Sequence, residues 1–183
     1  AKNYGFFPTP DSLAERTIED AKLYRQEGSF TVLEPSAGTG QLSRRATKHR
    51  AIVDCVEYQP DLAQALKVCG HHNNVWCCDF LQLKPSTTGL YDRVIMNPPF
   101  DRERDIDHVM HALKFLKNDG FLIAIMSAHT EFAESKKAQA FRALIAKMRG
   151  KFSDNPRNSF TSVGTNVNTI TLKVWKDSRE FWS

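Results

Sequence analysis

The sequence predicts an α/β protein in which helices alternate with the strands of a mostly parallel sheet. Short apolar runs are separated by segments with helical periodicity, an order typical of parallel strands joined by crossover helices. The expected strands lie at residues 30–33, 52–56, 75–78, 93–96 and 121–126, and the expected helices at 12–27, 41–49, 60–69, 105–117 and 132–149. Residues 159–175 carry β-branched alternation on both sides of Gly164, which predicts an antiparallel pair near one edge of the sheet.

Length and composition indicate one globular domain over residues 1–183. The chain is 41% hydrophobic and 25% charged, as is ordinary for a globular protein. Its net charge of +4 permits a nucleic-acid partner without requiring one. We find no signal peptide and no run long enough for a membrane span, and therefore expect a cytoplasmic protein. The four cysteines form no Cys-x-x-Cys pair, so we expect reduced thiols rather than a disulfide framework.

The four residues Asn97-Pro98-Pro99-Phe100 are the strongest candidate for a catalytic site. Two prolines cannot continue a sheet ladder, so the chain must leave the sheet directly after strand 93–96. Open parallel sheets bind ligands at this carboxyl edge. The Asn97 side-chain carbonyl and the Pro98 backbone carbonyl could accept the two protons of a planar exocyclic amine, while the Phe100 ring stacks on the group that carries it. A simple turn after a strand is the alternative interpretation.

A loop of small residues, Glu34-Pro35-Ser36-Ala37-Gly38-Thr39-Gly40, joins the first strand to the second helix. Small residues let the backbone approach a ligand closely, and the free N–H groups of a helix start can bind a carboxylate. The loop is not a phosphate loop, because the Gly-Lys-Ser/Thr ending is missing. It is not a strict Gly-x-Gly-x-x-Gly either, which weakens a nicotinamide interpretation.

Acidic residues also recur where the second and third strands end. Glu57 follows strand 52–56 and could accept hydrogen bonds from two ribose hydroxyls, with Tyr58 beside a base. Asp79-Phe80 follows strand 75–78 and offers an amine acceptor next to a second aromatic face. A single acidic strand end is more often a solvated charge, but the recurrence favours a nucleotide site at this edge.

The order of these motifs resembles that of the S-adenosylmethionine-dependent amino-methyltransferases. It is most similar to the N6-adenine DNA methyltransferases of the gamma type, whose cofactor motifs precede the catalytic tetrapeptide. Phe7-Pro8-Thr9-Pro10 is similar to the N-terminal motif of that class, and residues 160–169 to its late motif, whose aromatic residue packs against the flipped base. The resemblance covers nearly the whole chain. It implies a Rossmann-like class I methyltransferase fold with a mostly parallel seven-stranded sheet, an antiparallel C-terminal strand and helices on both faces.

The resemblance implies S-adenosylmethionine as the cofactor, no metal, and a role for each matching residue. At the methionine end of the cofactor it places Phe7, Pro8, Thr9, Pro10, Glu34, Ser36, Ala37, Gly38 and Gly40. At the nucleoside end it places Glu57 on the ribose and Tyr58, Asp79 and Phe80 around the adenine. The catalytic residues would be Asn97, Pro98, Pro99 and Phe100, of which Asn97 also borders the cofactor. The substrate-binding residues would be Phe100, Phe160 and Asn166.

The chain departs from this class because no segment is long enough for a separate target-recognition region. We therefore expect a very short recognition sequence, a partner subunit that reads DNA, or a substrate other than DNA. The charged residues Arg102, Glu103, Arg104 and Asp105 could border the substrate. Basic residues of the later half could contact nucleic acid or form a solvated helix face; they are Lys136, Lys137, Arg142, Lys147, Arg149, Lys151 and Arg157.

The leading hypothesis is transfer of a methyl group from S-adenosylmethionine to the N6 amine of adenine in DNA, with the base flipped out of the stack. The alternatives are an RNA base methyltransferase acting on adenine-N6 or guanine-N2, a protein glutamine methyltransferase, and an inactive methyltransferase-like binding subunit.

Histidines and cysteines elsewhere in the chain give weaker signals. The spacing of Cys69, His71, His72, Cys77 and Cys78 does not match a zinc finger, so we do not expect a zinc site. His108, His111 and His129 have no evident nucleophile partner and are interpreted as packing or surface residues.

Overall fold

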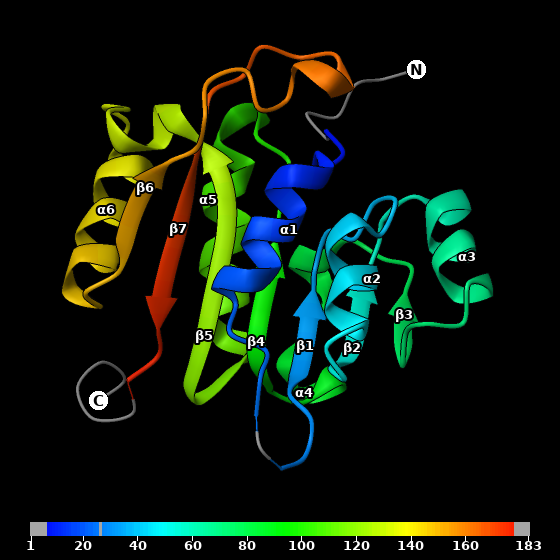
Figure 1. Ribbon diagram of the computed structural model, residues 1–183. Coiled ribbons are helices and arrows are strands. Elements are labelled where there is room, and N and C mark those ends of the chain that lie inside the picture. The colour runs from blue at the N-terminus through cyan, green and yellow to red at the C-terminus, as the bar shows by residue number, and fades with distance from the viewer. Residues whose placement is uncertain (1–6, 26, 178–183) are drawn as a thin grey trace.

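The computed structural model describes residues 7–25 and 27–177, which form a seven-stranded sheet with helices on both faces (Figure 1). The strands lie in the order β3-β2-β1-β4-β5-β7-β6. Their bounds are β1 Thr31–Glu34, β2 Ile52–Val56, β3 Asn74–Trp76, β4 Tyr91–Met96, β5 Leu116–Ser127, β6 Lys151–Asp154 and β7 Thr169–Trp175. The pairings from β3 to β5 are parallel, and β7 runs antiparallel to both β5 and β6. The predicted fold class, with its antiparallel C-terminal strand, is confirmed.

The two faces of the sheet carry separate hydrophobic cores. Successive side chains of a strand point to opposite faces, and in β4 Val94 and Met96 join one core while Ile95 joins the other. One core packs on α1 Asp11–Asp20, α2 Gln41–Thr47 and α3 Pro60–Val68, and the other on α5 Arg104–Ala112 and α6 Lys136–Lys147. The remaining helices are short: α4 Pro85–Thr88, η1 Phe80–Gln82, η2 Asp101–Glu103, η3 Leu113–Phe115, η4 Ala128–Glu131 and η5 Thr161–Val163. No helix in these described segments has the length and apolar character to cross a membrane.

The partner of the last strand differs from the prediction. β7 pairs with β6 at residues 151–154, whereas the segment just before Gly164 forms the short helix η5 within a loop. β6 has a weak sequence signal because Phe152 is its only apolar residue, and that ring packs on Phe141 of α6 with centroids 6.3 Å apart. Tertiary pairing therefore decides this strand, while the β-branched residues Thr161 and Val163 lie in the loop.

Helix α1 ends at Asp20, seven residues before the predicted end. Lys22 adopts a left-handed conformation, with φ of 53°. The Arg93 guanidinium donates to the backbone carbonyls of Ala21 (2.9 Å) and Lys22 (3.4 Å). A side chain from β4 thus satisfies carbonyls at the end of a distant helix, a contact that a local pattern cannot reveal.

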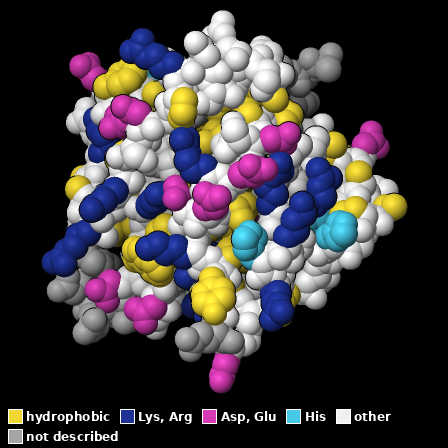
Figure 2. Space-filling view, viewed as in Figure 1, with side chains coloured by type: hydrophobic (Ala, Val, Ile, Leu, Met, Phe, Trp, Pro, Cys, Tyr) yellow, Lys and Arg dark blue, Asp and Glu magenta, His cyan; other side chains and the backbone are white. Residues whose placement is uncertain are grey.

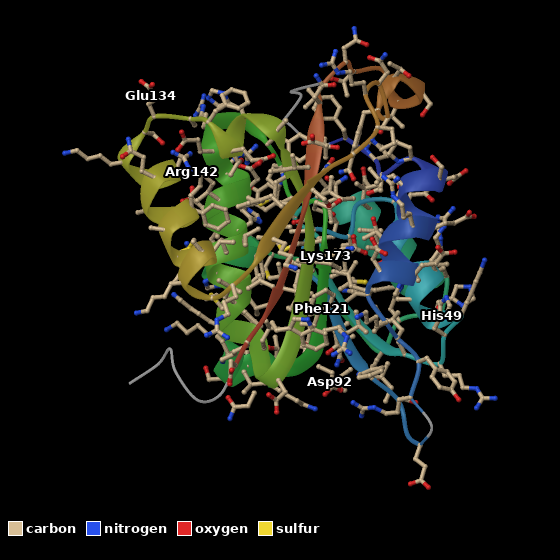
Figure 3. All side chains as sticks on the ribbon, turned by 60° about the vertical axis from the view of Figure 1, so that its left-hand side comes forward. His49, Asp92, Phe121, Glu134, Arg142 and Lys173 are labelled. Atoms are coloured by element: carbon tan, nitrogen blue, oxygen red, sulfur yellow. The ribbon has the colours of Figure 1, made fainter. Side chains whose placement is uncertain are left out.

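The carboxyl ends of β1 to β5 meet at the upper edge of the sheet in Figure 1, where the loop between β6 and β7 also lies. Asp92, labelled in Figure 3, marks the opposite edge, where its carboxylate accepts from the Thr31 backbone N–H at 2.9 Å. Every predicted cofactor and catalytic motif that follows a strand therefore reaches the same edge. Residues 7–10, which precede α1, reach it too and contact Asn97.

Candidate functional site

Asn97 lies at the end of β4 with its amide held in one orientation. The side chain is 4% exposed, and Nδ2 donates to the Phe7 backbone carbonyl (3.0 Å) and to Thr9 Oγ1 (2.9 Å). A backbone carbonyl can only accept a hydrogen bond, so the atom facing Phe7 must be the amide nitrogen. Both N–H groups are therefore used by the N-terminal segment, and Oδ1 remains the acceptor that this side chain can offer.

A small cavity of about 10 Å³ adjoins Asn97. It is lined by Pro8, Thr9, Glu34, Ser36, Ala37, Thr39, Gln41 and Asn97. Glu34 Oε2 and Ser36 Oγ are buried without a hydrogen-bond partner. Leaving a buried polar atom unpaired costs about 1–3 kcal/mol, so two such atoms at one small cavity indicate a place for a hydrogen-bond donor supplied by a ligand.

The charge of Glu34 depends on what occupies this cavity. Burial raises the pKa of its carboxyl well above the ordinary value, hydrogen bonds from Ser43 oppose the rise, and nearby Glu57 adds to it. The free protein therefore favours the protonated acid. A cationic group placed beside Oε2 would favour the carboxylate instead.

The glycine loop is held in place by the acidic residue at the end of β2. Glu57 Oε2 accepts from the Gly38 backbone N–H at 2.7 Å, and Oε1 accepts from the Gln59 N–H at 3.0 Å. Gly38 and Gly40 have φ values of 55° and 82°. At Gly40 a Cβ atom would also come within 2.9 Å of Leu66 Cδ2, so the loop needs glycine there for both reasons.

A larger cavity of about 300 Å³ lies beside this loop, over β2 to β4. It is lined by Pro35, Ser36, Glu57, Tyr58, Gln59, Cys78, Asp79, Phe80, Leu81, Pro99, Arg104 and His108. The structure thus brings the predicted nucleoside-end residues to one cavity together with Pro99. Tyr58 is 66% exposed and its ring is available for stacking, whereas Phe80 is 2% exposed and borders the cavity from the core. Asp79 Oδ1 accepts from the Leu81 N–H at 3.0 Å, and Oδ2 is not used in that bond.

The wall of this cavity includes two residues of α5 that were not predicted to bind the cofactor. Arg104 and His108 lie on α5, one turn apart, so their side chains share a helix face. His108 packs on Phe80, as its interpretation as a packing residue expected, and it also lies in the cavity wall. The i, i+4 spacing directly after the tetrapeptide is the signal that could have found the pair.

Phe100 belongs to a cluster of three aromatic rings. Its ring centroid lies 6.3 Å from that of Phe7 and 6.1 Å from that of Phe160, which meets it edge to face. Phe160 is fully buried and its ring supports that of Phe100, so its expected contact with a base stays a prediction. Asn166 is exposed in the same loop, and Pro98 is buried behind Asn97.

A second cavity, of about 270 Å³, borders Phe100 and η4. It is lined by Phe100, Arg102, Glu103, Asp105, Ile106, Ser127, His129, Thr130 and Ala133. The charged residues 102–105 are therefore divided, with Arg104 lining the larger cavity and the other three lining this one. Arg102 and Glu103 have φ values of 54° and 57°, and Ser135 Oγ donates to the Glu103 carboxylate at 2.9 Å. Such conformations cost roughly 1–3 kcal/mol each and often mark functional loops.

The basic residues of the later half are spread along α6 and the segment that follows it. Arg142, labelled in Figure 3, donates to the backbone carbonyls of Thr130 (2.9 Å) and Ala133 (2.8 Å), and so supports the η4 turn. Lys137 pairs with Asp107, and Lys147 lies at the far end of α6 (Figure 1). On the face drawn in Figure 2, Lys and Arg side chains alternate with Asp and Glu, and the upper part over the β6–β7 loop is mostly uncharged.

The fold and the position of these cavities define the class of the structure. It is the Rossmann-like fold of class I S-adenosylmethionine-dependent methyltransferases. No protein-family model and no curated protein sequence matches the chain. The likeness is therefore one of structure, at sequence identities that establish the fold.

Three solved structures illustrate the likeness. A protein assigned as a class I S-adenosylmethionine-dependent methyltransferase from Listeria monocytogenes has a TM-score of 0.75 at 14% identity; the match covers 95% of this chain, which spans only 62% of that one. The 23S rRNA methyltransferase ErmE has a TM-score of 0.66 at 21% identity, over 97% of this chain and 72% of that one. The plantazolicin methyltransferase BpumL, solved with SAH, has a TM-score of 0.61 at 14% identity, over 90% and 83%.

Replacing Gly40 by alanine should destabilise the protein more than the same change at Gly164. Both glycines are left-handed, with φ of 82° and 90° and ψ of 21°, but a Cβ at Gly164 would meet no atom within 4 Å. The left-handed alanine costs about 1–2 kcal/mol at both positions, so the excess loss at Gly40 measures the contact with Leu66. Urea unfolding of the two variants checks this, and equal losses would contradict it.

The buried Asp105 should make stability fall as the pH rises. Burial raises the pKa of its carboxyl from 3.8 to about 6, against hydrogen bonds from Ser127, Ile106 and Thr130. The contribution of Asp105 to the free energy of unfolding is complete below pH 4. It falls by about 3 kcal/mol as the pH rises past 6. Unfolding of wild type and Asp105→Asn across this range should show the difference, with exposed Asp61→Asn as control. If the stability of Asp105→Asn changed with pH in the same way as that of wild type, the prediction would be contradicted.

Proposed function

We propose that the protein transfers a methyl group from S-adenosylmethionine to the exocyclic N6 amine of adenine in DNA. The observation that carries the proposal is the Asn97 amide, whose two N–H groups are engaged by Phe7 and Thr9. That arrangement presents Oδ1 as an acceptor next to the Pro98 carbonyl, beside a cavity with two unpaired polar atoms. The methyltransferase fold supports the same conclusion.

The residues of the chain fit such a cofactor. Glu34 and Ser36 have unpaired buried oxygens that suit the ammonium group of a methionine moiety. Each Glu57 oxygen accepts one backbone N–H, from Gly38 of the glycine loop and from Gln59, and a carboxylate has about four acceptor positions, so ribose hydroxyls can still be bound. Asp79 and the exposed Tyr58 ring line the cavity that suits an adenine. When bound, the cofactor supplies an electrophilic methyl group on a sulfonium sulfur.

The tetrapeptide then prepares the acceptor amine. Asn97 Oδ1 and the Pro98 carbonyl each accept one N–H, which turns the nitrogen lone pair out of the ring plane and toward the methyl group. S-adenosylmethionine held by Glu34, Ser36 and Glu57 would supply the methyl group to this nitrogen, so that a C–N bond would replace the C–S bond and the surplus amine proton would pass to solvent. No basic side chain is required, because positioning and the two acceptors supply the rate enhancement.

RNA adenine is the second candidate. ErmE, named for 23S rRNA, shares the fold over nearly the whole of this chain. An unpaired RNA base also avoids the few kcal/mol needed to extrude a base from duplex DNA. A separate recognition subunit remains part of the DNA proposal, because the chain has no long segment for that purpose.

Product analysis tests the proposal directly. The full chain is incubated with methyl-labelled S-adenosylmethionine and duplex DNA, single-stranded DNA, ribosomal RNA or protein, and nucleic acid is digested to nucleosides. We expect N6-methyladenine from DNA. Asn97→Ala should lower transfer by about 100-fold or more while S-adenosylhomocysteine still binds. Asn118→Ala, exposed at the opposite edge, serves as control. Label found only in RNA moves the assignment to the second candidate, and label only in protein overturns both.

Cofactor affinity should rise with pH through Glu34. The free protein favours the protonated acid, and a bound cation favours the carboxylate, so binding releases a proton. Titration calorimetry with S-adenosylmethionine should show tighter binding as the pH rises, between the Glu34 pKa of the complex and that of the free protein. Glu34→Gln should flatten this dependence and exposed Glu131→Gln should not. If the affinity of Glu34→Gln changed with pH as that of wild type does, the proton released on binding would come from another group.

A further inference from the structure

His108 on α5 lines the larger cavity and has a ring nitrogen without a hydrogen-bond partner. The side chain is 9% exposed, and its Nδ1 is buried with no hydrogen-bond partner. The ring packs on Phe80 with centroids 5.8 Å apart, so it stands in the same part of the wall as Asp79-Phe80. A buried ring nitrogen without a partner, on a side chain that lines a cavity, indicates a group that a ligand completes.

His111, one turn further along α5, shows what a purely structural histidine looks like in the same surroundings. Its ring meets Phe80 (4.8 Å) and Phe115 (5.2 Å), and its Nε2 lies 2.8 Å from the Leu83 carbonyl oxygen. It is absent from the cavity lining. The two histidines share a helix and an aromatic neighbour, so the difference between them lies in the unpaired nitrogen and the cavity.

The His108 imidazole is neutral at neutral pH. Burial lowers its pKa to about 4; Arg104 and His111 also lower it, whereas Asp79 and Asp107 act in the opposite direction. A neutral imidazole carries one N–H donor and one acceptor nitrogen. It can therefore donate to a ring nitrogen of a heterocycle without bringing a positive charge into the cavity.

We propose that His108 selects adenine as the base of the cofactor, by donating to a purine ring nitrogen while Asp79 accepts from the neighbouring exocyclic amine. Adenine presents an amine donor next to ring-nitrogen acceptors. Hypoxanthine presents a carbonyl acceptor next to an N–H donor, so the same two residues would oppose it. This inference rests on the proposed function, since it concerns the nucleoside end of the cofactor.

Binding of cofactor analogues to the full chain tests the inference. Affinities are measured by titration calorimetry for S-adenosylhomocysteine and for its 1-deaza and 7-deaza analogues, each of which lacks one ring acceptor. Wild type should bind one of the two deaza analogues about 3- to 10-fold more weakly, as expected for one neutral hydrogen bond. His108→Phe keeps the aromatic packing; it should bind S-adenosylhomocysteine more weakly by a similar factor and no longer distinguish that analogue.

His111→Phe is the matched control and should retain the wild-type discrimination. The wild-type measurement needs no variant, so the inference is tested even if His108→Phe folds poorly, which thermal unfolding would show. Equal affinity of wild type for all three compounds would overturn the role of His108, and so would unchanged discrimination in His108→Phe. Failure of wild type to bind S-adenosylhomocysteine at all would instead overturn the cofactor assignment on which the inference rests.

Discussion

The arrangement at the sheet edge depends on the two hydrogen bonds donated by the Asn97 amide. They join the segment before α1 to the end of β4, across about ninety residues of chain, and they determine which atom of the amide faces the cavity. Without them the side chain could rotate and present N–H groups where an amine must be accepted. The N-terminal segment is therefore part of the site, although it lies outside the sheet.

A second constraint comes from Glu57, which serves the loop as well as the cavity. Its two bonds to the Gly38 and Gln59 N–H groups keep the backbone close to the end of β2. Glu57 also lines the larger cavity. One carboxylate can thus hold the loop in its conformation and still offer oxygen atoms to a ligand, because each oxygen has more than one lone pair.

In the described part of the chain, the buried side-chain atoms that have no hydrogen-bond partner gather at this one edge, and they belong to Glu34, Ser36 and His108. Arg102 and Glu103, two of the seven described non-glycine residues with positive φ, lie at the same edge. Elsewhere the two cores are apolar and the strands alternate between them. Proteins keep such costly features mainly where binding or chemistry compensates for them, which agrees with a ligand site between the glycine loop and the tetrapeptide.

By itself the sequence determined the order of strands and helices, the parallel sheet and the set of motifs at its carboxyl edge. These follow from local patterns: apolar runs, helical spacing, and prolines or glycines where the chain must turn. Only the tertiary structure decided the rest. It paired β7 with β6, placed Phe160 behind Phe100, ended α1 with Arg93 and brought His108 into the cavity wall. Each of these results from a contact between residues far apart in the chain. Such contacts produce no periodic pattern in the sequence from which they could be predicted.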